Sequence, residues 1–145
     1  MKTLMIKQRV VENLRNAQHD RSRLYLLGRS SKGTICGYEL IATGTGSGCT
    51  YMPQHGTGEI TAAYSKLYKR GFIPVAFGHI ISKEVLYSFR LNYGNISWSF
   101  RLFGPLPENQ SNVPIIQIYG NEPVHAIILP PPQYIVSHIP IKIKS

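Results

Sequence analysis

Acidic residues are scarce in this sequence of 145 residues, which has 7 Asp and Glu against 16 Lys and Arg and a formal net charge of +9. Asp20 is the only aspartate. No acid lies at a recognisable spacing from a serine or cysteine nucleophile and a histidine, so the sequence argues against a catalytic triad. We therefore assign no catalytic residue.

Cysteines and long apolar runs are also few. Cys36 and Cys49 are too few for a disulfide framework, and their spacing does not match a two-by-two zinc pattern, so we expect a reducing, cytoplasmic environment. The first nine residues carry a charge every few positions, unlike a signal peptide. No segment approaches the roughly 20 apolar residues of a membrane span, and we expect no membrane partner.

The apolar content of 43% suits a single domain over residues 1–145 with its own core. Helical spacing predicts helices over 4–18 and from Thr57 to a stop at Gly71. The second helix should carry Ile60, Ala63, Tyr64, Leu67 and Tyr68 on one face. Strand-like runs lie at 24–27, 34–41, 72–81, 87–91, 98–102, 115–119 and 124–129. Alternation with Pro140 in its midst predicts an extended edge strand or tail over 130–145. The fold class is thus mixed α/β.

Positive charge is concentrated near the N-terminus, since residues 1–32 hold eight basic and two acidic side chains. A field of this kind attracts polyanions. The alternative is a solvated helix face that only aids solubility. Two sets of basic residues are candidate contacts for nucleic acid or an acidic protein. The first is Lys7, Arg9, Arg15, Arg21 and Arg23, and the second is Arg90 and Arg101 on the predicted hairpin 87–102.

Three segments carry a resemblance to a known family. They are Arg23-Leu-Tyr-Leu-Leu-Gly-Arg29, Tyr64-Ser-Lys-Leu-Tyr-Lys-Arg-Gly71 and Pro74-Val-Ala-Phe-Gly-His-Ile-Ile-Ser82. The order of helix, hairpin, helix and buried strand followed by Gly-His resembles the JAB/MPN domain, the Mov34 or JAMM family, over about residues 4–130. The resemblance implies a central mixed sheet of about six to eight strands with two main helices.

The resemblance also implies where a metal would lie. Active members bind zinc through a His-Ser-His pair at the end of this strand and a downstream aspartate, with a glutamate before the first strand as acid/base. Aligned on Ser82, the histidine positions hold Ile81 and Lys83, and a frame that begins at His79 supplies one histidine. No aspartate follows, and Lys83 would repel a divalent cation. We expect a degenerate metal position at His79, Ile81, Ser82 and Lys83, with no metal or cofactor.

A metal site built from other residues is the weaker interpretation of the remaining ligands, which are His55, His79, His125, His138, Cys36, Cys49 and Glu59. His79 and His125 are instead expected to be hydrogen-bonded residues within strands.

The leading hypothesis is a non-catalytic JAB/MPN-like binding or scaffold domain, whose basic N-terminal face engages nucleic acid or an acidic protein within a larger assembly. Two alternatives stay open. One is a diverged JAMM-type zinc metallopeptidase with substituted ligands, and the other is a structural subunit of a viral or ribonucleoprotein particle.

Overall fold

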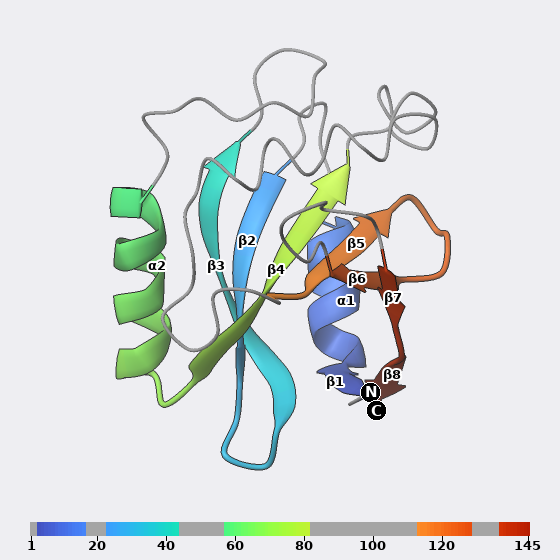
Figure 1. Cartoon of the computed structure of the whole chain (residues 1–145), viewed down its shortest axis with the longest axis horizontal. Helices are drawn as coiled ribbons and strands as arrows, with labels where there is room; N and C mark the ends of the chain where they lie inside the picture. Colours follow the sequence, from blue (N-terminus) through green and yellow to red (C-terminus); the bar gives the residue numbers. More distant parts are fainter. Residues whose placement is uncertain (1–2, 17–22, 44–56, 82–112, 129–136) are drawn as a thin grey trace.

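Eight strands and two helices make up the part of the chain that this computed structural model describes, residues 3–16, 23–43, 57–81, 113–128 and 137–145. The helices are α1 (Gln8–Asn16) and α2 (Thr57–Lys69). The strands are β1 (Leu4–Lys7), β2 (Arg23–Arg29), β3 (Thr34–Thr43), β4 (Ile73–Ile81), β5 (Ile115–Tyr119), β6 (His125–Ile128), β7 (Ser137–Ile139) and β8 (Ile141–Lys144). The predicted mixed α/β class, with one central mixed sheet and two helices, is confirmed (Figure 1).

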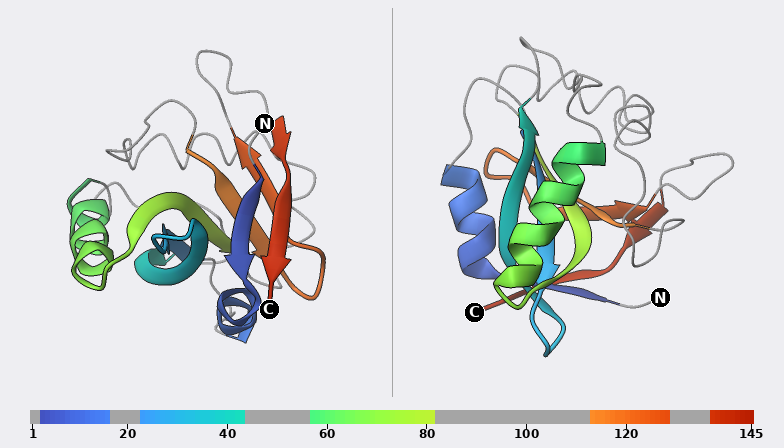
Figure 2. Two further views of the ribbon diagram at one scale, coloured as in Figure 1. Left: turned by 90° about the horizontal axis from the view of Figure 1, so that it is seen from below. Right: turned by 90° about the vertical axis from the view of Figure 1, so that its left-hand side faces the viewer.

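All eight strands belong to one mixed sheet in the order β7-β6-β5-β4-β2-β3-β1-β8. The strands at the two ends of this order, β7 and β8, are consecutive in the chain and separated only by Pro140. β7 pairs antiparallel with β6, and β8 pairs parallel with β1. The Leu4 N–H donates to the Pro140 carbonyl at 2.9 Å. One segment therefore links the two ends, and the sheet is nearly closed (Figure 2).

Residues 4–7 form strand β1, so the prediction that the first helix begins at residue 4 is wrong. β1 lies between β3 and β8, and Ile6 is paired with Ile35 on one side and Ile143 on the other. A short run such as Leu-Met-Ile-Lys fits either a helical turn or a strand. The sheet decides, because it buries Ile6 completely, at 0% exposure. The helix begins at Gln8.

The two helices pack on opposite faces of the sheet. Consecutive strand residues point to opposite faces, and β2 shows the division: Leu27 belongs to the core cluster around α1, whereas Gly28 faces Leu67 of α2. Figure 2 shows the sheet between the helices. The cluster on the α1 side consists of Ile6, Val10, Val11, Leu14, Tyr25, Leu27, Ile35, Ala76, Ile80, Ile116, Ile118, Val124 and Ala126.

The last residue of helix α2 is Lys69, and Gly71 is the predicted terminating glycine, with a φ of 85° in the left-handed region that favours glycine. The Gly71 N–H donates to the Tyr68 carbonyl and the Phe72 N–H to the Leu67 carbonyl, both at 3.0 Å. These two bonds form a Schellman motif, which satisfies the last carbonyls of the helix. The chain then turns directly into β4.

Phe72 fills a slot between two glycines that face each other across β2 and β3, Gly28 and Gly37. A methyl group at Gly37 would lie 2.5 Å from Phe72 Cδ2, and one at Gly28 would lie 2.8 Å from Phe72 Cβ. The Arg70 guanidinium lies 5.3 Å above the Phe72 ring and forms a 2.9 Å ion pair with Glu39 of β3. This stack attaches the end of α2 to the hairpin.

The outer face of α2 differs from the prediction of one apolar stripe. Ala63 and Leu67 are buried and Tyr64 is partly buried, but Tyr68 is 62% exposed. A helix buries only the side chains that point toward the sheet. Leu67 points toward it, and Tyr68 lies about 100° farther around the helix axis. The predicted strands 87–91 and 98–102 lie outside the described residues.

We predict that Gly37→Ala lowers the free energy of unfolding by about 1–3 kcal/mol, because the new methyl group overlaps the Phe72 ring and overpacking costs about that much. Urea unfolding measures the change. A Gly37→Ala/Phe72→Leu double variant should lose less than the sum of the two single variants, since the smaller side chain relieves the overlap. Strict additivity would contradict this account of the slot.

Candidate functional site

Basic residues from the two ends of the chain lie side by side on β1 and β8. In this parallel pair, Lys7 is opposite Lys144 and Met5 is opposite Lys142. Directly paired residues point to the same face of a sheet, so the three lysines share one face. Ile6 points to the other face, where it is buried in the core. Lys142 and Lys144 of β8 therefore lie on the same face as Lys7 of β1, and the two strands together form one positively charged surface.

The same end of the sheet also carries basic residues from β2, from the β2–β3 turn and from α1. Register partners run from Ile73 on β4 to Arg29 on β2, Ile35 on β3, Ile6 on β1 and Ile143 on β8. Lys32 lies in the β2–β3 turn just beyond Arg29, and the Arg9 guanidinium donates to the Cys36 carbonyl on β3 at 3.2 Å. We call this group the basic end. It consists of Lys7, Arg9, Arg29, Lys32, Lys142 and Lys144.

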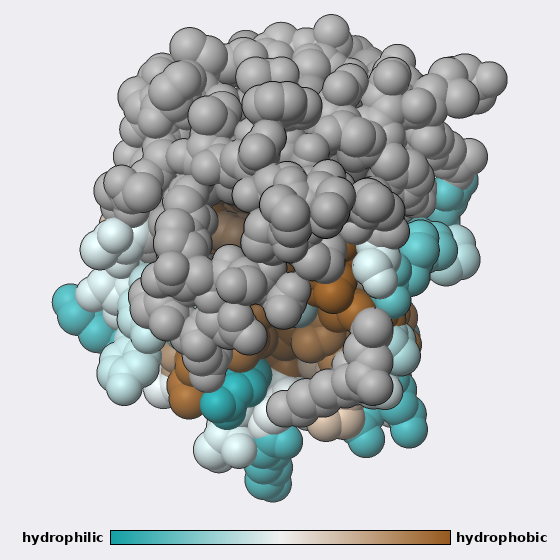
Figure 3. All heavy atoms as spheres, viewed as in Figure 1, coloured by the Kyte–Doolittle hydropathy of each residue, from teal (hydrophilic) through white to brown (hydrophobic). Residues whose placement is uncertain are grey.

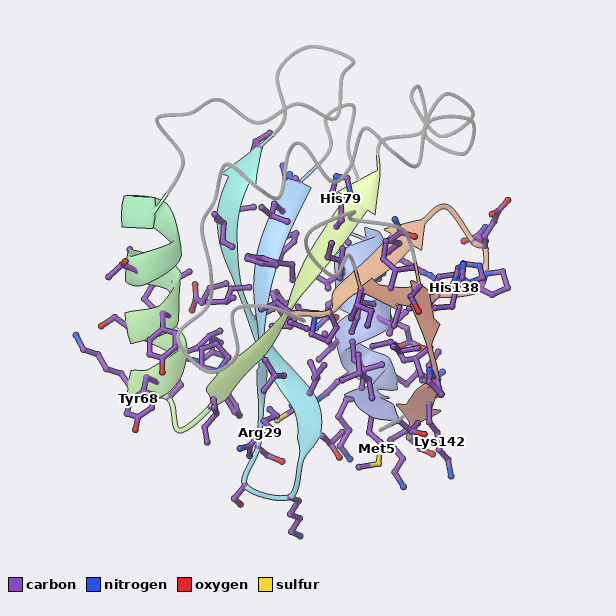
Figure 4. The ribbon with its side chains drawn as sticks, viewed as in Figure 1. Met5, Arg29, Tyr68, His79, His138 and Lys142 are labelled. Atoms are coloured by element: carbon purple, nitrogen blue, oxygen red, sulfur yellow. The ribbon has the colours of Figure 1, made fainter. Side chains whose placement is uncertain are left out.

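Three of the six members of the basic end face solvent. Arg9, Lys32 and Lys142 are exposed. Lys7 Nζ donates to the Ser145 backbone oxygen at 3.1 Å. Within the described ranges, Lys32, Lys142 and Lys144 have no ion pair with a carboxylate. Figure 4 places Arg29 and Lys142 toward the lower end of the molecule, where Figure 3 shows hydrophilic residues.

The predicted N-terminal set is divided by the fold. Lys7 and Arg9 belong to the basic end, but Arg23 begins β2 and Arg29 ends it. β2 has 7 residues, so Arg23 lies about 20 Å from the basic end at about 3.3 Å per residue. Arg15 is partly buried, and its Nη2 donates to the Glu122 carbonyl at 2.6 Å. Arg21, Arg90 and Arg101 lie outside the described residues.

Sequence reasoning left four members of the basic end out of its candidate contacts: Arg29, Lys32, Lys142 and Lys144. Arg29 and Lys32 were within the basic segment 1–32, and the turn residues beside them gave a signal of exposure. Lys142 and Lys144 alternate with isoleucines, which marks one charged face of a strand. The sequence could not show that this face continues that of β1.

The predicted degenerate metal position centres on His79, near the end of β4. Its side chain is fully buried, and this burial lowers the pKa of the imidazole from an ordinary 6.5 to about 3. Its register partners are Leu24 on β2 and Gln117 on β5. No three His, Cys, Asp or Glu side chains of the described ranges lie together as metal ligands do. Ser82 and Lys83 lie outside these ranges, as does the side chain of Ile81.

His79 begins a row of polar side chains that no sequence pattern predicted. Gln117 is opposite His79 and His125 is opposite Gln117, so all three point to one face of the sheet. The rings of His125 and His138 meet edge to face with centroids 5.9 Å apart. Gln117 is fully buried, and its amide has no hydrogen-bond partner among the described residues. The row runs from the interior at His79 to the surface at His138 (Figure 4).

No family model matches the sequence, and no curated protein matches it significantly. Among solved structures, the chain is similar to the solution structure of protein DSY2949 from Desulfitobacterium hafniense, a structural genomics target. The two share 13% sequence identity with a TM-score of 0.60, over 98% of this chain and 93% of the other. At this identity the likeness shows the fold alone. Neither described helix is long and apolar enough to cross a membrane.

We predict that the free energy of unfolding falls as the pH drops below 6.5, and that His79 accounts for part of the slope. The unfolded chain binds a proton at His79 below pH 6.5, whereas the folded chain does not bind it until about pH 3. One such group contributes about 1.4 kcal/mol per pH unit, or about 2 kcal/mol between pH 6.5 and about pH 5.

His79→Gln cannot titrate, so its stability should fall less over the same interval. Urea unfolding of both proteins at about pH 7 and about pH 5 gives the two differences. Equal losses in the wild type and the variant would mean that His79 is not held neutral in the fold.

Proposed function

We propose that this chain is a non-catalytic binding domain with a JAB/MPN-like fold, and that its basic end holds a polyanionic partner within a larger assembly. The observation that carries the proposal is the pairing of β1 with β8, which sets Lys7, Lys142 and Lys144 on one face. Nearby charges from Arg9, Arg29 and Lys32 extend the same field. Nucleic acid and an acidic protein surface are the two chemistries that such a field attracts.

The order of elements supports the JAB/MPN part of the proposal. The segments that carry the resemblance are β2, the second half of α2 and β4, and they occur as hairpin strand, helix and buried strand. β2 and β4 are neighbours in the sheet, with Leu24 opposite His79. In the JAB/MPN family the metal strand and the strand that follows the acid/base glutamate are expected to be close to each other. A buried, neutral His79 and the absence of a second histidine beside it favour a scaffold over a hydrolase.

The spacing of the charges supports binding at one end rather than over the whole surface. The Debye length is about 8 Å at physiological salt, so charges about 20 Å apart act almost independently. Within the basic end, Lys7, Lys142 and Lys144 come from the adjacent strands β1 and β8, which lie about 5 Å apart. They therefore act on a polyanion together, while Arg23 at the other end of β2 contributes little to the same contact.

We expect the affinity for a short DNA duplex to fall about a hundredfold between about 50 and about 200 mM salt, as for a protein that neutralises about four phosphates. Lys142→Gln/Lys144→Gln should lower the slope of log affinity against log salt by about 2. Fluorescence anisotropy with a labelled duplex measures both, and polyglutamate as a second probe extends the test to acidic proteins.

Arg15→Gln/Arg23→Gln is the matched variant, because it removes the same charge from two residues that the structure places outside the basic end. It should change the slope less than the β8 variant does. Equal effects of the two variants would show that net charge, not the basic end, sets the affinity. An affinity for both probes that does not change with salt would contradict the proposed function itself.

A further inference from the structure

The C-terminal half of α2 adds an aromatic surface beside the basic end. Tyr64 and Tyr68 are stacked one helical turn apart, with ring centroids at 5.8 Å and an angle of 12° between the planes. Tyr68 is 62% exposed, although an aromatic ring of this size is usually largely buried. Its neighbour in the stack restricts the ring, which lowers the conformational entropy lost when a flat ligand covers it.

Two lysines lie in the same stretch of α2 as this stack. A helix turns about 100° per residue, so Lys69 lies about 100° from Tyr68 around the helix axis, whereas Lys66 lies about 160° from it. Both lysines are exposed. Arg70 is the exception, because it is engaged by Glu39 and by the Phe72 ring. The result is an exposed aromatic ring with the exposed Lys69 on one flank.

The end of α2 is also continuous with the basic end. Three residues after Arg70, β4 begins at Ile73, which is the register partner of Arg29. Figure 4 shows Tyr68 and Arg29 both toward the lower end of the molecule. A strand of phosphates that follows the lysines of α2 would therefore be led toward Arg29 and Lys32.

We propose that this surface binds single-stranded nucleic acid, with a base stacked on Tyr68 and the adjacent phosphates held by Lys69 and the basic end. This inference rests on the proposed function and names its partner. Bases are splayed outward in single strands, and each has a flat face that stacks on an aromatic ring whatever its sequence. An acidic peptide offers carboxylates but no such face, so the exposed stack favours nucleic acid over an acidic protein.

The test measures binding of a fluorescent single-stranded oligodeoxythymidylate by anisotropy, with polyglutamate as a competitor. Tyr68→Ala should weaken binding of the oligonucleotide about tenfold, within the range for one stacked base. Tyr68→Phe keeps the ring and should bind like the wild type. The affinity for polyglutamate should not change in either variant, because the charges are intact.

Leu40→Ala is the control for loss of an exposed apolar side chain, since Leu40 is 47% exposed on β3 and not on α2. It should bind the oligonucleotide like the wild type, and unfolding curves check that all variants fold. Unchanged binding in Tyr68→Ala would overturn the inference and leave the basic end intact. Tighter binding of polyglutamate than of the oligonucleotide would overturn it in favour of an acidic protein. If the wild type showed no salt-dependent binding to either the oligonucleotide or polyglutamate, the proposed function itself would be contradicted.

Discussion

The parallel pairing of β1 with β8 joins segments about 135 residues apart, and both the nearly closed sheet and the basic end depend on it. Closing so long a loop costs about 4 kcal/mol on a logarithmic scale of length. The pairing offsets this cost by burying Ile6 completely between two strands. It also fixes the start of α1, whose Val10 and Leu14 pack on the same core. Without β8, β1 would expose an unpaired edge.

This pairing also brings like charges together. Lys7 lies directly opposite Lys144, an arrangement that destabilises a sheet. A neutral residue at either position would keep the alternation of apolar and polar side chains and remove the repulsion. Local rules of stability therefore do not account for the two lysines, and proteins most often break such rules at functional sites. A polyanion that bound between them would remove the repulsion and make the same pair favourable.

Local patterns predicted those elements whose signals lie within a few residues. Gly71 stopped α2 because the end of a helix is a local event, and the turn of Ser30 to Gly33 joined β2 to β3 for the same reason. The strand at Leu4 to Lys7 was predicted as helix because its partners, β3 and β8, are remote in sequence. The predicted set of basic contacts was wrong in part for the same reason. Arg23 and Lys7 are close in sequence, but Arg23 lies at the end of β2 that is far from the basic end. The row from His79 to His125 likewise exists only through strand register.

Phe72, which packs against Gly28 and Gly37, holds the C-terminal end of α2 against the sheet. Gly28 and Gly37 leave room for the ring on the sheet, and Arg70 is held above it by Glu39. The Schellman bonds leave the chain little freedom between Tyr68 and Phe72. Tyr68 and Lys69 are therefore fixed relative to the hairpin that bears Arg29, and little ordering is left to be done when a ligand binds. A surface that is rigid before binding gains affinity mainly because this cost is small. The glycine pair thus contributes to binding although it touches no ligand.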